Sequence, residues 1–271
     1  MTLEAEDLPS YKDLPKVKGM PHGCAWGLFD KHDGQKDQLG TLNLLTPKKV
    51  RRAKEEIQTG VRVSLDYPLN AVKDPGHNRI PLAHKFKDLR PIVVGLDEEI
   101  TINTQTSSQW DGLRHWAHQG SQLYYNGLTH EEICGPNKTI RNGIQEWLRG
   151  GGVVGRGILL DYYSWAQGQG IQYSPASTHK ISEKDLDEVA AAQGTELLPG
   201  DILIVRSGWI HWFNNASDEE RDEATKKRQH YCGVEGTESS LEWLWNNHFA
   251  ALAGDTMAFE AWPAPEKHRK L

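Results

Sequence analysis

The alternation of apolar and polar positions predicts helices and strands in turn along the second half of the chain. Residues 181–194 carry Ser182 at the N-cap position, Asp185 three residues later, Leu186 on the apolar face and Gly194 at the end, which together predict a helix. Helical spacing also predicts helices at 139–152 and 237–249. Short apolar runs predict buried strands at 155–162, 202–209 and 250–259. This order indicates a mixed α/β domain whose strand ends are available for chemistry.

The first half of the chain shows one clear helix signal and several weaker strand signals. Thr46 at the N-cap position, Pro47 at the first helical position and Gly60 at the end predict a helix between them. Strands are expected at 61–65, 91–95 and 99–109, with a loop at 68–90. Residues 1–40 have no period and are expected to form an N-terminal arm laid over the core.

Composition limits the classes of partner and compartment. The chain has 271 residues, 37% of them hydrophobic, and a net charge of −6, so it can bury a core but lacks the basic surface that nucleic acids and anionic membranes require. Its 3 cysteines have no C-x-x-C spacing, which argues against a disulfide framework and favours a reducing compartment. No apolar leader or membrane-length segment is present. We therefore expect a cytoplasmic protein that binds a small molecule.

The stretch TQTSSQWDGLRH at residues 104–115 concentrates the candidate site chemistry. Gln105, Gln109 and Asp111 share the parity of a strand, with His115 a short turn beyond. If the chain stays extended here, two amides, one carboxylate and one imidazole surround a common volume. Such a group suits either a metal site or an acid/base site.

Ligand chemistry leaves these two interpretations open. Transition ions prefer imidazole, thiolate or carboxylate, so the amides of Gln105 and Gln109 are poor ligands. Alternatively, both glutamines hydrogen-bond the neighbouring backbone while Trp110 packs into the core. His118, three residues after His115, is a further candidate for completing a site.

Several segments together resemble, in order and spacing, the cyclase family that includes bacterial kynurenine formamidase and isatin hydrolase. They are LGTLNLLTPKKVRRAKEEIQTGVRVSLDYPLN, the 104–115 stretch, RGILLDY, ISEKDLDEVAAAQGTELLPGDILIVRSGW and AALAGDTMAFEAW. The resemblance runs from about residue 25 to 262 and implies a swivelling β/β/α domain of α/β class, in which helices flank a mixed sheet. It further implies one such domain at 41–271, assembled as a homo-oligomer.

The family signature, H-x-G-T-H-x-D-x-P-x-H, assigns roles to residues of the 104–115 stretch. The resemblance implies that Asp111 binds a divalent metal, Zn or Mn, and that His115 is the acid/base. Both metal histidines of the signature are glutamine here, at Gln105 and Gln109. The family also places a further histidine and glutamate in a segment after AGDTMAFEAW, and we expect that segment to be missing.

These implications predict an enzyme that hydrolyses a C–N bond of an amide or formamide, or a lactone bond, in a small cyclic or aromatic substrate. Trp110, Trp116 and His118 are the candidate substrate-binding residues, with core packing as the alternative for both tryptophans. A second hypothesis is a metal-independent isomerase, dehydratase or cyclase that uses His115 and Asp111. A third is a small-molecule binding protein without catalysis.

Overall fold

The computed structural model describes residues 4–264, which divide into two compact units. The larger unit comprises residues 4–59, 111–214 and 231–264, and the smaller unit comprises residues 60–110 and 215–230. Among the described residues, no helix has the length and apolar character needed to cross a membrane.

A parallel three-stranded sheet forms the core of the larger unit. Its strands are β5 (Gly157–Leu160), β7 (Ile202–Val205) and β9 (Ala251–Gly254), in the order β5-β7-β9. Strand β7 lies centrally, with Leu203 opposite Ile158 in the register, and both side chains are buried. The three strands predicted from apolar runs are therefore confirmed.

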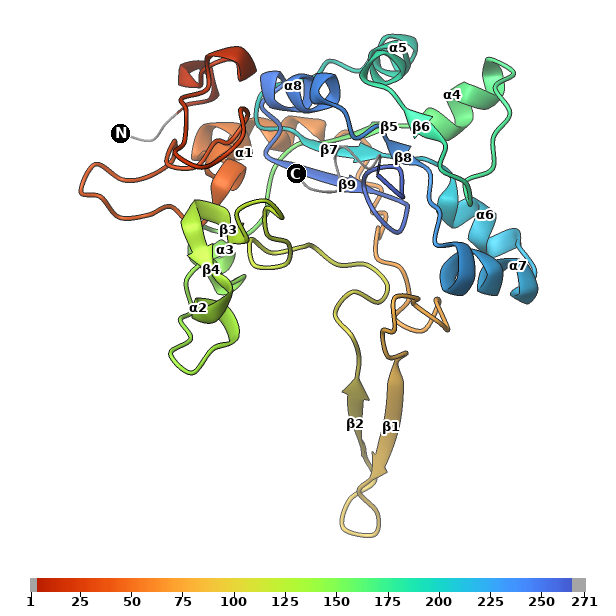
Figure 1. Cartoon of the computed structure of the whole chain (residues 1–271). Coiled ribbons are helices and arrows are strands. Elements are labelled where there is room, and N and C mark those ends of the chain that lie inside the picture. The colour runs from red at the N-terminus through yellow and green to blue at the C-terminus, as the bar shows by residue number, and fades with distance from the viewer. Residues whose placement is uncertain (1–3, 265–271) are drawn as a thin grey trace. The chain divides into compact units, whose positions relative to one another are not determined.

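Helices α4 (Tyr162–Gly168), α5 (Glu183–Gln193) and α8 (Glu238–Asn246) belong to the same unit (Figure 1). Helix α5 contacts β5, α4 and α8, and Leu186 on its inner face is fully buried. Ser182 and Asp185 form the predicted capping box, and Gly194 ends the helix at a φ of 66°. This left-handed conformation favours glycine because a side chain there is strained. The predictions of helices at 181–194 and 237–249 are confirmed.

Shorter elements complete the larger unit. The antiparallel pair β3 (Leu123–Tyr124) and β4 (Leu128–Thr129) leads into α2 (His130–Cys134), and a parallel pair joins β6 (Lys180–Ile181) to β8 (Gly233–Val234). The helix expected at 139–152 is limited to α3 (Gln145–Arg149). Asn142 before it has a φ of 60°, which prevents the helix from starting earlier. Helix α6 (Trp209–Asn215) follows β7. Together these helices and strands confirm the predicted α/β class.

The segment 40–60 forms less helix than its signals predict. Helix α1 (Pro47–Ala53) begins at the expected proline, but a single 3₁₀ turn (Lys54–Glu56) follows it and the helix does not continue to Gly60. Thr46 stands at the N-cap position without a side-chain cap bond. Ile57, which follows this turn, is 75% exposed.

The N-terminal segment is irregular, with 3₁₀ turns at Ala5–Asp7, Tyr11–Asp13 and Gly40–Leu44. It contacts the end of α8, because the Tyr11 N–H donates to Asn246 and the Trp245 indole donates to the Pro9 carbonyl.

The smaller unit contains the hairpin of β1 (Ala83–Asp88) and β2 (Leu96–Thr101), together with α7 (Asp218–Asp222) and the π-helical turn Glu223–Arg228. The strand expected at 61–65 is wrong, since no strand of the described chain pairs with this segment. The strand at 91–95 is also wrong, because this apolar run is the turn of the hairpin. The loop predicted at 68–90 ends too late, since β1 occupies its last part.

Candidate functional site

The 104–115 stretch is a series of turns, so the extended geometry expected for it is wrong. Strand β2 ends at Thr101. The Asn103 side chain then accepts a hydrogen bond from the Gln105 N–H at 2.9 Å, and Ser107 has a φ of 66°. Both features turn the backbone. Gln105, Gln109 and Asp111 therefore do not project from one face of a strand, as the extended geometry would require.

The two glutamines belong to the smaller unit. The Gln109 Nε2 lies 3.5 Å from the Gln105 Oε1, at the outer limit of a hydrogen bond. The neighbouring Ser108 hydroxyl accepts from the Tyr67 N–H at 2.6 Å, which fixes the turn. Trp110 is 42% exposed, so it is not enclosed in a core as the packing alternative requires.

Asp111 and His115 form a charge pair in the larger unit. The His115 Nε2 lies 3.8 Å from the Asp111 Oδ2. A turn positions the imidazole, because the His115 N–H donates to the Gly112 carbonyl at 2.9 Å. The Trp116 ring centre is 6.2 Å from that of His115, and Trp116 is 66% exposed. A carboxylate beside a solvent-accessible imidazole suits proton transfer.

His118 links this segment to a neighbouring strand. Its N–H donates to the Leu123 carbonyl at 2.9 Å, and its Nδ1 accepts from the Ser121 N–H at 3.1 Å. Because Nδ1 accepts, the ring proton of neutral His118 lies on Nε2. The Ser121 hydroxyl is also 2.9 Å from Nδ1.

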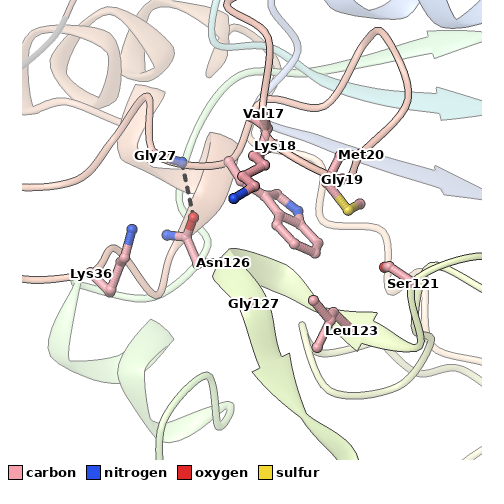
Figure 2. Close-up of a pocket in the computed structure, with 11 residues that line it drawn as sticks. Val17, Lys18, Gly19, Met20, Gly27, Lys36, Ser121, Leu123, Asn126 and Gly127 are labelled. Atoms are coloured by element: carbon pink, nitrogen blue, oxygen red, sulfur yellow. Dashed lines mark hydrogen bonds between the residues drawn. The ribbon is translucent and has the colours of Figure 1, made fainter.

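A pocket of about 350 Å³ lies in the larger unit beside Ser121 (Figure 2). Ser121 and Leu123 come from the segment that His118 holds, and the opposite walls come from the N-terminal segment and the turn after β3. The pocket residues are Val17, Lys18, Gly19, Met20, Trp26, Gly27, Lys36, Ser121, Leu123, Asn126 and Gly127. Its volume and largely apolar walls fit a small organic ligand.

The pocket is lined by two lysines, Lys18 and Lys36, and they differ in their charge partners. Lys36 is paired with Asp30 at 2.7 Å. Burial tends to raise the pKa of Asp30, but hydrogen bonds from Lys36, the Asp37 N–H and Asn126 outweigh it and hold that pKa below its usual value. Within residues 4–264, Lys18 has no carboxylate partner. An anionic group in the pocket would therefore meet Lys18.

Asn126 holds the pocket wall together. It is buried, with a φ of 55°. Its side-chain oxygen accepts from the Gly27 N–H at 2.9 Å, the bond dashed in Figure 2. Its amide nitrogen donates to Asp30 at 2.9 Å. This asparagine therefore joins the turn after β3 to the N-terminal segment.

Sequence reasoning missed the pocket because its walls come from segments without periodicity. Trp26 and Lys18 lie in the segment predicted as a covering arm. The glycines that flank the tryptophan in GCAWG were the available signal, since they permit close backbone approach.

The donors present do not fit a transition-metal site. Among residues 4–264, no three His, Cys, Asp or Glu side chains converge as a metal-binding group. Asp111 and His115 provide one carboxylate and one imidazole, and Gln105 and Gln109 add only neutral amides in the other unit. Metal binding through these residues stays a prediction, and the mechanism below uses only the groups of the chain.

The larger unit combines a pocket with a carboxylate–imidazole pair on an α/β scaffold, and enzyme sites contain both features. A family model described as "Putative cyclase" matches residues 41–261. The chain belongs to this cyclase family, as its sequence resemblance implies, and is an enzyme.

Solved structures share the fold. One described as a novel cyclase matches with a TM-score of 0.72 and 26% identity, covering 86% of this chain and 78% of that one. Isatin hydrolase A from Labrenzia aggregata, bound to benzyl benzoate, matches with a TM-score of 0.50 and 11% identity over 78% of this chain and 75% of its own. Isatin hydrolase A from Ralstonia solanacearum matches with a TM-score of 0.50 and 13% identity, over 83% of this chain and 80% of its own. No curated protein matches the chain.

Proposed function

We propose that the chain hydrolyses the C–N bond of a small aromatic or cyclic amide or formamide, or the ester bond of a lactone. The observation that carries the proposal is the Asp111–His115 pair, with 3.8 Å between the carboxylate and the imidazole. Cyclase-family membership over residues 41–261 supports an enzyme of this kind, and the isatin hydrolases with the same fold suggest a cyclic amide as one substrate.

His115 acts as the general base. The Nε2 of His115 faces Asp111 at 3.8 Å, so the tautomer with its proton on Nε2 leaves Nδ1 as the proton acceptor. It takes a proton from water as the water oxygen bonds to the substrate carbonyl carbon. His115 then returns this proton to the departing nitrogen or oxygen as the C–N or C–O bond breaks. Asp111 fixes the tautomer and stabilises the imidazolium that forms between the two steps.

The pocket binds the substrate ring. Trp26 and Leu123 provide apolar surface, and Lys18 attracts the carboxylate that hydrolysis releases. His118 connects the two parts, since it follows His115 by three residues and bonds the pocket residue Ser121. Three residues span at most about 11 Å between Cα atoms, which is compatible with the proposal that the proton carrier and the pocket serve one substrate.

Turnover of three probes tests the proposal: isatin for cyclic amides, formanilide for aryl formamides and dihydrocoumarin for lactones. We expect at least one probe to be hydrolysed: isatin and dihydrocoumarin would open to a product heavier by one water, and formanilide would split into aniline and formate. His115→Ala should lower kcat/KM by about a hundredfold or more, and Asp111→Asn by about tenfold or more. His84→Ala removes an exposed histidine of β1 and should leave turnover unchanged.

Two results would contradict the proposal. Full turnover by His115→Ala would remove the assigned base. A product equal in mass to its substrate, lost in Asp111→Asn, would show that the same pair moves protons in an isomerisation instead.

A further inference from the structure

A cysteine, a histidine and a tyrosine form a second cluster in the larger unit, outside the pocket. On α2, Cys134 lies one helical turn after His130, and its Sγ is 3.1 Å from the His130 Nε2. The Tyr124 hydroxyl lies 3.1 Å from the other ring nitrogen, Nδ1. The imidazole thus has a thiol on one side and a phenol on the other.

The proton positions follow from these contacts. When His130 Nδ1–H donates to the Tyr124 oxygen, Nε2 is left as an acceptor that faces the thiol. The Sγ is also 3.5 Å from the His130 carbonyl, a longer contact. Cys134, His130 and Tyr124 therefore form a chain of contacts from a nucleophile to a base to a group that orients the base.

The other two cysteines lack this environment. Cys232 is buried, and burial raises the pKa of its thiol to about 12. Burial also raises the pKa of Cys24. Cys134 is exposed to solvent, so a small reagent reaches its sulfur. The chain therefore provides its own unreactive comparison thiols.

This cluster is separate from the proposed active site. Leu123 lines the pocket, whereas Tyr124 is the next residue of the same strand, and successive strand residues point to opposite faces. Neither the Asp111–His115 pair nor the pocket uses Cys134.

We propose that Cys134 is an oxidation site for peroxides, with His130 as its base. The sulfur attacks one peroxide oxygen as His130 takes the thiol proton, the S–O bond forms and the O–O bond breaks. The proton passes to the departing hydroxide and gives water. Sulfur loses two electrons to the peroxide and becomes a cysteine sulfenic acid, which a thiol can reduce again.

Peroxide treatment of the full chain tests this site. Hydrogen peroxide is added with a 1,3-diketone that traps sulfenic acid, and labelling of each cysteine is followed by peptide mass spectrometry. We expect Cys134 to be labelled about tenfold or more faster than Cys24. His130→Ala should slow labelling of Cys134 by about tenfold. Tyr124→Phe keeps the ring and removes the hydroxyl, so it should slow labelling by a smaller factor.

Comparison variants separate this role from exposure alone. Cys24→Ser should leave the rate at Cys134 unchanged, and Cys134→Ser should abolish the fast labelling. Circular dichroism confirms that each variant is folded. An unchanged rate at Cys134 in His130→Ala, or a rate in the natural chain no faster than that of glutathione, would overturn the proposal.

Discussion

At the scale of single residues, we predict that the amides of Gln105 and Gln109 set the affinity of the chain for zinc. Their polar atoms are 3.5 Å apart within one unit, so two imidazoles at these positions could approach one ion. Amide oxygens bind zinc weakly, whereas imidazole is among its preferred ligands. We predict weak zinc binding by the natural chain and at least about tenfold tighter binding by Gln105→His with Gln109→His, measured by calorimetric titration.

Gln105→His alone is the control and should give a smaller gain. Tight zinc binding by the natural chain, or identical titrations for the double variant and the natural chain, would show that these positions do not determine metal affinity.

His179 sets a pH dependence of stability. Its Nε2 lies 2.8 Å from the Tyr162 hydroxyl, and its ring stacks on Tyr173 with 4.0 Å between ring centres. Burial lowers the pKa of His179, and Asp185 offsets this only in part. The unfolded chain takes up this proton near pH 6.5, about the ordinary value, but the folded chain does so only at lower pH. Stability from His179 is therefore full above about pH 6.5 and is lost as pH falls below it.

Thermal unfolding between about pH 7.5 and about pH 5 measures this effect. His179→Gln should show a smaller fall in Tm toward acid pH, because a neutral amide replaces the titrating group. His32→Gln, at an exposed position, is the control. An equal fall in Tm for His179→Gln and the natural chain would rule the effect out.

Part of the candidate site could be predicted from the sequence. The spacing of Asp111 and His115 sets the pair within one turn, and the pairing needs no distant contact. The pocket could not be predicted, because Lys18 and Ser121 come together only through tertiary contacts of irregular segments. The turn at Ser107 also escaped prediction, since serine rarely adopts its positive φ.

At the scale of elements, local sequence signals were sufficient to predict a helix or strand where both of its ends carry such signals. Helix α5 has a capping box at one end and Gly194 at the other, and it was predicted within one residue. The segment 61–65 has the alternation of a strand but forms no strand of the described chain, and its Val61 and Val63 are 75% and 73% exposed. An alternating pattern requires a neighbouring strand, which the pattern itself does not specify.

The cap of α5 gives a prediction at this scale. The Ser182 hydroxyl accepts from the Asp185 N–H at 3.2 Å, and Asp185 accepts from the Ser182 N–H at 2.8 Å. Removing the hydroxyl leaves a helix-terminal N–H without its acceptor. We expect Ser182→Ala to lower the free energy of unfolding by about 1 kcal/mol, measured by urea denaturation. Ser182→Thr keeps the hydroxyl and should retain most of the stability; an equal loss in both variants would contradict a capping role.

At the scale of the whole molecule, the β1–β2 hairpin is the surface at which we expect copies of the chain to associate. Its strand side chains form two different faces. Phe86, Leu96 and Ile100 share one face and are 63%, 62% and 55% exposed, and the polar residues of that face are His84, Asp88 and Glu98. On the other face Lys85 stands opposite Glu99, as is typical of a solvated surface. A two-stranded hairpin is marginally stable in water, so the three exposed apolar side chains on it favour a covering partner.

We predict that a second copy of the chain covers the hairpin face that carries Phe86, Leu96 and Ile100. Sedimentation of the natural chain should show a dimer or larger species, and Phe86→Glu with Ile100→Glu should weaken association by at least about tenfold, because charges then replace apolar surface at the contact. Lys87→Gln, on the charged face opposite Asp97, is the matched control and should associate as the natural chain does. A natural chain that sediments only as a 30.5 kDa species at working concentration would show that the hairpin face is not covered by a second copy.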